Sequence, residues 1–169
     1  MVIFIYSLFS ILFSVNPILI QSDGQWIDKY SYLVEPRDQT FTINQVMVSS
    51  DFVFLDGENK NFGINNDVVW LKYSVKNQTN SPEKYLLINN PSLDNIELYI
   101  VYKGEILQTQ TGGRLASFKD RPIRTKSIIF SINLPLDEDV DVYLKISSVN
   151  KTIITSSINS LEVIDSLIN

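Results

Sequence analysis

The sequence has 169 residues, a net charge of −5, and neither Cys nor His. This length suits one domain, and a composition of 44% hydrophobic and 20% charged residues can bury a core. The negative charge argues against nucleic acid as a partner, because phosphate binding needs clustered Lys and Arg. Without Cys or His there is no disulfide, thiolate zinc site, Cys nucleophile or imidazole base. We expect no cofactor, and the remaining chemistry is carboxylate catalysis, Ca²⁺ or Mg²⁺ binding through oxygen, or none.

Residues 1–20 are mostly apolar and carry no charged side chain. A run of this length can cross a bilayer, which needs about 20 residues. A cleaved secretory signal fits its N-terminal position, the break at Asn16-Pro17 and the polar stretch from Gln21. An uncleaved membrane anchor fits the missing basic region and the poor cleavage motif at Ile20-x-Ser22. Both alternatives predict a leader over residues 1–22 and one exported domain over residues 23–169, in the periplasm or outside the cell.

The N-terminal half of the domain begins with a predicted short strand over residues 26–33 and a turn over residues 35–39. Thr42, followed three residues later by Gln45, fits a capping box and predicts a helical turn, with a strand over residues 41–48 as the alternative. A brief strand is expected over residues 52–55, followed by a Gly- and Asn-rich loop.

The rest of the chain alternates apolar and polar residues with a period of two, which is typical of strands buried on one face. Strands are predicted over residues 69–76, 85–88, 96–102, 105–110, 124–134, 140–147, 152–158 and 161–164. Many short strands separated by turns predict an all-β sandwich or barrel. The predicted core comprises Leu71, Tyr73, Val75, Leu98, Ile100, Phe130, Ile132, Val142 and Leu144.

Three aromatic residues fall on the polar side of their strands, namely Trp70, Tyr99 and Tyr143. If these strands are neighbours, the rings form an exposed aromatic platform, which suits the apolar faces of sugar rings. The alternative, which the usual burial of large aromatics favours, is that another segment covers them.

Three further groups of polar residues each have a functional interpretation and a plainer one. Arg114, Asp120, Arg121 and Arg124 fall in one loop and could bind an anionic or polyhydroxyl ligand, although a solvated loop explains most of them. The acidic run over residues 137–141 lacks the spacing of a calcium loop and fits a solvated turn. Asn77 and Asn150 begin N-glycosylation triplets, a pattern that is frequent by chance.

Four segments resemble, in order, a known family. They are DVVWLKYSVKN, NNPSLDNIELYIV, GGRLASFKDRPIRTKSIIFSINLP and VYLKISS, with Trp70, Pro91, Tyr99, Phe118 and Tyr143 among the matching residues. The family is the second extracellular module of bacterial seven-transmembrane receptors with diverse intracellular signalling modules, and the resemblance covers residues 26–158.

The resemblance implies a jelly-roll-like β-sandwich similar to carbohydrate-binding modules, acting as the input domain of a membrane receptor. Such receptors carry a later hydrophobic region and an output domain, which are not found before Asn169. The chain is therefore expected to be either a fragment of a larger receptor or a free-standing secreted version.

Together these observations predict a sensor module for a carbohydrate or related small polar molecule. Its expected ligand contacts are Trp70, Tyr99, Tyr143, Arg114 and Arg121, and its expected partner is a membrane-embedded signalling region. An enzyme is not expected, with a carboxylate-only glycosidase as the main enzymatic alternative. The other alternative is a protein-interaction or dimerisation module, since interfaces also favour Tyr, Trp and Arg.

Overall fold

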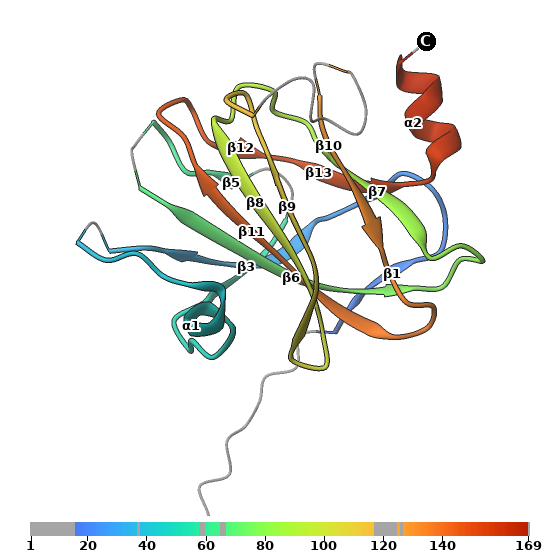
Figure 1. Cartoon of the computed structure of the whole chain (residues 1–169), viewed down its shortest axis with the longest axis horizontal. Helices are drawn as coiled ribbons and strands as arrows, with labels where there is room; N and C mark the ends of the chain where they lie inside the picture. Colours follow the sequence, from blue (N-terminus) through green and yellow to red (C-terminus); the bar gives the residue numbers. More distant parts are fainter. Residues whose placement is uncertain are drawn as a thin grey trace, which may run out of the picture.

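The computed structural model describes residues 16–168, apart from residues 37, 58–59, 65–66, 117–124 and 126. Within these residues, two β-sheets pack against each other as a sandwich (Figure 1), so the predicted all-β class is confirmed. The larger sheet has the order β4 (Val53–Asp56), β3 (Lys29–Val34), β6 (Val69–Asn77), β11 (Asp139–Ser147), β8 (Asn95–Tyr102) and β9 (Glu105–Gly112), and β1 (Ile18–Ile20) also pairs with β6.

The smaller sheet has the order β10 (Ile128–Asn133), β7 (Glu83–Ile88), β13 (Ser156–Asn159) and β2 (Gln25–Trp26). A separate pair joins β5 (Lys60–Asn61) to β12 (Ile153–Ile154). Helix α1 (Ile43–Met47) lies beside the larger sheet, and α2 (Leu161–Ile168) lies beside β7 (Figure 1). Neither helix is long and apolar enough to span a bilayer, and the described residues contain no other candidate.

Because side chains alternate along a strand with a period of two, one face of each main strand packs between the sheets. β11 runs antiparallel to β6 and β8, so that Leu144 lies opposite both Leu71 and Leu98. All nine predicted core residues are buried in one hydrophobic cluster. Each fully buried aliphatic side chain stabilises the fold by about 1.5–3 kcal/mol, and a one-residue register slip would expose the whole set.

The edges of the two sheets are joined by side chains of β9. Gln108 donates from Nε2 to the Ser131 carbonyl at 2.8 Å and accepts the Asn133 N–H at 3.2 Å, while Gln110 also donates to Ser131. These bonds satisfy backbone groups on the free edge of β10, where no strand supplies partners within the described residues.

The capping box is confirmed. Thr42 is the N-cap of α1, its Oγ1 accepts the Gln45 N–H, and the Gln45 side chain accepts the Thr42 N–H. The strand predicted over residues 161–164 is wrong, because this segment begins α2. Ile164 is buried against Tyr85 and Ile129, whereas Leu161 is exposed. So short an apolar run cannot be assigned to helix or strand from its period alone.

Strand β1 comes from residues that the predicted leader includes. Ile18 to Ile20 run parallel to Val75 to Asn77 of β6, and the Ile20 carbonyl accepts the Gln78 N–H at 2.9 Å. Ile20 is only 1% exposed and belongs to the main core. The packed domain therefore includes Ile18–Ile20.

Candidate functional site

The three predicted aromatic rings are neighbours on the outer face of the larger sheet. Tyr143 lies directly opposite Tyr99 in the β11–β8 register, and Trp70 stacks on Tyr99 with ring centroids 5.9 Å apart. They do not form an exposed platform, because Trp70 is 0% and Tyr143 2% exposed. The alternative, in which another segment covers the rings, is therefore confirmed. Val46 of α1 and Phe52 after it pack in the same hydrophobic cluster as Trp70 and Tyr143.

A buried acidic residue holds this cover in place. Trp70 donates from Nε1 to Glu35 Oε1 at 2.7 Å, and the Phe41 N–H donates to the same oxygen at 3.2 Å. Lys145 Nζ lies 3.6 Å from Glu35 Oε1 and 5.3 Å from the Trp70 ring centroid. Charge-assisted hydrogen bonds of this kind are strong, and they give Trp70 a structural role in fixing the segment before α1.

Next to the covered rings, the same face of β6 and β11 is open. Two hollows of about 240 and 370 Å³ share Lys72 and Ser74, and Asp141 and Tyr143 line the larger one. We call the surface formed by Lys72, Ser74, Asp141 and Tyr143 the β6–β11 groove. The smaller hollow arises because β3 pairs with β6 up to Lys72 whereas β1 pairs with it only from Val75.

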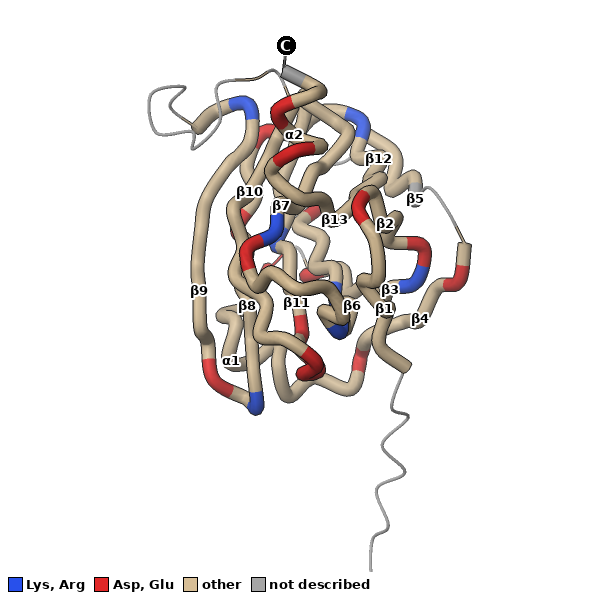
Figure 2. Tube along the Cα trace, turned by 90° about the vertical axis from the view of Figure 1, so that its right-hand side faces the viewer, with Lys and Arg blue, Asp and Glu red and all other residues tan. Residues whose placement is uncertain are grey.

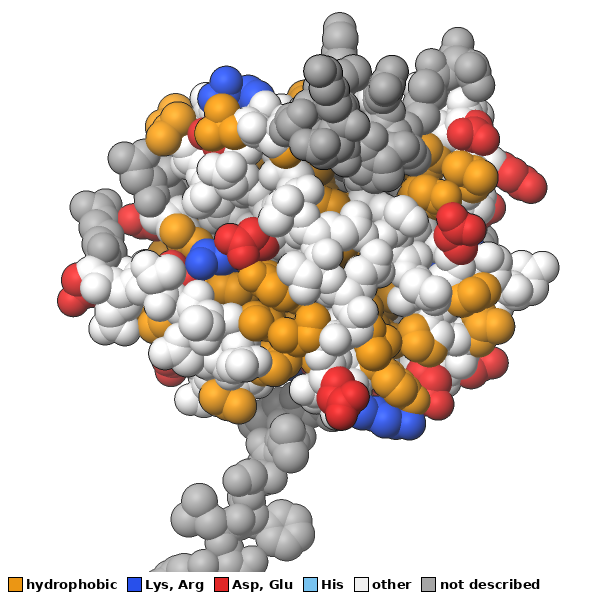
Figure 3. Space-filling model, viewed as in Figure 1, with side chains coloured by type: hydrophobic (Ala, Val, Ile, Leu, Met, Phe, Trp, Pro, Cys, Tyr) orange, Lys and Arg blue, Asp and Glu red, His pale blue; other side chains and the backbone are white. Residues whose placement is uncertain are grey.

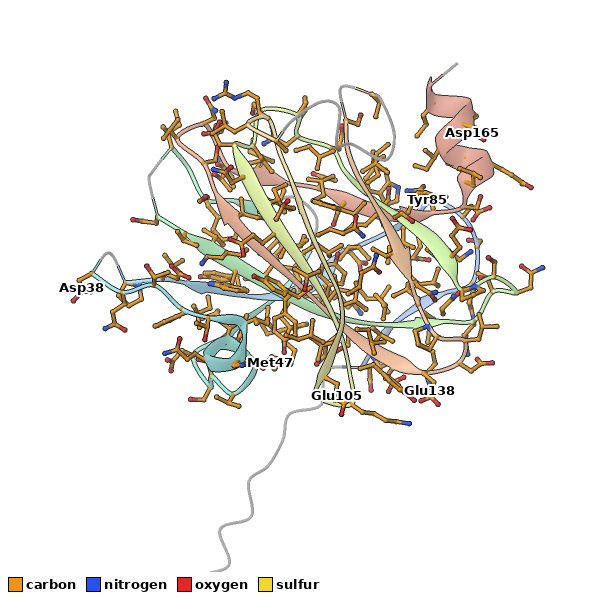
Figure 4. All side chains as sticks on the ribbon, viewed as in Figure 1. Asp38, Met47, Tyr85, Glu105, Glu138 and Asp165 are labelled. Atoms are coloured by element: carbon orange, nitrogen blue, oxygen red, sulfur yellow. The ribbon has the colours of Figure 1, made fainter. Side chains whose placement is uncertain are left out.

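The walls of the groove combine apolar and charged side chains. Phe52, Phe54, Lys29 and Ser31 line the smaller hollow, and Met47, Val101, Lys103 and Asp139 line the larger one. Figure 3 shows hydrophobic side chains gathered between α1 and the β8–β9 hairpin. In Figure 4, Met47, Glu105 and Glu138 lie along the lower side of the molecule. Phe54 is 45% exposed, so this ring is open to a ligand.

The groove floor is an ordered network of opposite charges. Lys72 Nζ lies 3.3 Å from Asp141 Oδ2, and Ser74 donates to the other carboxylate oxygen of Asp141. Burial lowers the pKa of the Lys72 ammonium, but Asp141 and Tyr143 outweigh this effect and the net pKa is raised. Burial also raises the pKa of the Tyr143 hydroxyl, with Lys72 opposing it. Lys72 therefore stays cationic and Tyr143 neutral near pH 7.

Tyr99 borders this network from β8. Its hydroxyl donates to Glu97, and burial together with this bond raises the pKa of Tyr99 to about 12. Its hydroxyl is therefore protonated at physiological pH.

Arg114 is engaged elsewhere and is not among the groove-lining residues. Its Nε and Nη2 donate to Asp94 Oδ1 at 2.9 and 2.6 Å, and the Val149 N–H donates to Asp94 Oδ2 at 2.9 Å. The Val149 N–H and then Arg114 lower the pKa of Asp94. This carboxylate ties three loops together. The other predicted contact, Arg121, lies outside the described residues, as do Asp120 and Arg124.

Three of the four acidic residues in the run over residues 137–141 form ion pairs with lysines. Asp139, Asp141 and Glu138 contact Lys76, Lys72 and Lys103 at 3.0, 3.3 and 3.8 Å. No group of three or more acidic side chains in the described part of the chain is placed to hold a metal ion.

The glycosylation triplets are occupied by internal contacts. Asn77 is 1% exposed and donates to the Ser81 and Leu134 carbonyls, and Asn150 donates to the Ser92 carbonyl. Buried or engaged amides of this kind are poor acceptors for a glycan.

Sequence reasoning missed Ser74, Asp141 and Phe54 as site residues. Alternation alone indicates that Lys72 and Ser74 share a face of β6. It does not reveal that Asp141 lies directly opposite Ser74, because that depends on the register of two strands distant in sequence.

The sequence profile of the family described as 7TMR-DISM extracellular 2 matches residues 28–160. The chain belongs to this family, the extracellular module of seven-transmembrane receptors, and the sensory role expected from the resemblance is confirmed at that level. No curated protein matches the sequence.

Proposed function

We propose that this domain senses a carbohydrate or a related small polar molecule, which it binds in the β6–β11 groove. The observation that carries the proposal is the combination of a half-exposed ring, Phe54, with the paired Lys72, Ser74 and Asp141. Sugar rings need an apolar surface for their C–H faces and fixed donors and acceptors for their hydroxyls.

The network is suited to hydroxyl recognition because its polar atoms are already oriented. Lys72 and Asp141 side chains are each 33% exposed, so each keeps hydrogen-bonding capacity toward the solvent. Of the contacts predicted from sequence, Tyr143 lines the groove directly, and Trp70 and Tyr99 pack beside it in the same hydrophobic cluster. Export by the N-terminal leader, coupling to a membrane-embedded receptor region and the absence of catalysis are parts of the same proposal.

The test is a glycan array followed by titration calorimetry of the best ligand with the full-length chain. Asp141→Asn keeps the shape of the groove but removes the charge of the Asp141 carboxylate, and it should weaken binding about 10-fold or more. Asp165→Asn is the matched control, because Asp165 is an exposed carboxylate on α2 and lines neither hollow of the groove. Equal affinity of Asp141→Asn and the unaltered chain, or no glycan binding at all, would contradict the proposal.

A protein-interaction module is the second candidate, and the edge strand β9 supports it. Ile106 and Leu107 are 41% and 49% exposed there, and β9 is the last strand of the larger sheet. Exposed edge strands can pair with a second chain. Sedimentation of the full-length chain distinguishes the candidates: a tight dimer broken by Leu107→Lys, without glycan binding, favours the interaction module.

A further inference from the structure

A separate cavity of about 490 Å³ lies at the α2 end of the sandwich, away from the β6–β11 groove. Its walls come from the segment after β1, the β6–β7 turn, the start of β7 and the start of α2. Figure 2 shows α2 lying close to β7 and β13 at this end, and Tyr85 and Asp165 lie on the same side in Figure 4.

The deepest charged group at the cavity is Lys84. It lies on the same face of β7 as Leu86 and Ile88, which belong to the main core, and it is only 3% exposed. No hydrogen bond or ion pair joins its ammonium to another described residue, and Lys84 is among the residues that line the cavity. The Lys84 ammonium therefore has no counter-ion among the described residues, and it is available to pair with an anionic group in the cavity.

Ser160, which also lines the cavity, carries a second polar group without a partner among the described residues. Asn159 pairs with Tyr85, so Ser160 is the next residue in register opposite Lys84. The Ser160 Oγ is buried and has no hydrogen-bond partner among the described residues, whereas the Ser160 carbonyl accepts the Ile164 N–H at 3.3 Å. A serine before a helix usually caps the first-turn amides. Here the hydroxyl does not, which leaves the positive end of α2 open.

Acidic residues also line the cavity, in addition to Lys84 and the N-terminus of α2. Asp23 and Glu162 also line the cavity and are exposed, which places them toward the solvent. Glu83 is already engaged, because its carboxylate accepts the Tyr85 hydroxyl at 2.7 Å. A simple anion would be repelled by Asp23 and Glu162, and a simple cation would be repelled by Lys84. A ligand that carries both charges satisfies both sets of groups.

We propose that this cavity binds a small zwitterion of the α-amino acid class. Its carboxylate pairs with the Lys84 ammonium and accepts the Ser160 hydroxyl, and its ammonium lies against Asp23 and Glu162. This places the negative group of the ligand next to the positive end of α2, where helix termini favour anions. The site is independent of the β6–β11 groove and of the ligand proposed for it.

The test titrates each of the twenty common L-amino acids against the full-length chain by calorimetry. At least one should bind, while its amide, its N-acetyl derivative and acetate should bind much more weakly. Lys84→Met keeps the aliphatic stem and should weaken binding about 10- to 100-fold. It should fold normally, because it removes an unpaired buried charge. Ser160→Ala should weaken binding about 2- to 10-fold.

Two controls separate this site from other sources of binding. Lys151→Met removes an exposed lysine that does not line the cavity, and Asp141→Asn alters only the groove. Both should leave amino acid affinity unchanged. The proposal is overturned if no amino acid binds, if acetate binds as tightly as the amino acid, or if both Lys84→Met and Ser160→Ala retain full affinity.

Discussion

Replacement of Ile20 by Ala tests whether β1 belongs to the folded domain. Ile20 is 1% exposed in the main core, and its strand pairs with β6 over three residues. Core Ile→Ala changes cost about 2–5 kcal/mol, and the lower half of that range applies where surrounding structure can collapse onto the cavity. A three-residue strand has such freedom, so we expect the free energy of unfolding to fall by about 2–3 kcal/mol.

Leu19 provides the matched control, because it lies in the same strand on the opposite face and is 43% exposed. Leu19→Ala should cost about 1 kcal/mol or less. Urea unfolding of both variants, followed by tryptophan fluorescence, measures the difference. Equal effects of the two substitutions would refute the packing of β1.

Truncations extend this test to the predicted leader. A chain that lacks residues 1–15 keeps β1, whereas one that lacks residues 1–22 loses the burial of Ile18 and Ile20. That burial amounts to about 3–6 kcal/mol as an upper bound, a large share of the about 5–15 kcal/mol typical of a domain. The longer deletion should therefore unfold at much lower urea concentration.

Two further predictions concern the buried polar groups. Glu35→Gln leaves Lys145 without its buried counter-ion, so the free energy of unfolding should fall by about 3 kcal/mol in urea; no change would show that the pair contributes nothing. Tyr99→Phe tests alkaline behaviour: the folded pKa of about 12 exceeds the reference value of about 10, so the native state holds this proton longer. The raised pKa of Tyr99 adds to the free energy of unfolding; this contribution is complete below pH ~10 and is lost as the pH rises toward 12. Unfolding curves of Tyr99→Phe should decline less across that window than those of the unaltered chain, and parallel curves would contradict the assignment.

The sandwich core was predictable because burial on one face of a strand imposes a period of two. Leu71, Leu98 and Leu144 follow that rule, and all lie in the main cluster. The capping box at Thr42 was predictable for a different reason, since its two hydrogen bonds join residues only three apart. Each of these two signals lies within a single short segment of the sequence.

The candidate site depended on contacts that one segment cannot reveal. Alternation correctly placed Trp70 away from the core, yet Glu35, its hydrogen-bond partner, is 35 residues earlier. Asp141 reaches Ser74 only through the β6–β11 register, across 67 positions. Similarly, the apolar composition of Ile18 to Ile20 suits a membrane segment and a buried strand equally well.

The network that hides the aromatic rings also gives the groove its shape. Tyr143 is held between Phe52, with ring centroids 6.4 Å apart, and Lys72, whose ammonium lies 5.4 Å from the Tyr143 ring centroid. Phe52 follows α1, and the segment before α1 is fixed by Glu35. The groove wall and floor are therefore set by packing before any ligand arrives. Such preorganisation reduces the entropy lost on binding, so burial of Trp70 strengthens the case for a groove although it removes that ring from direct contact.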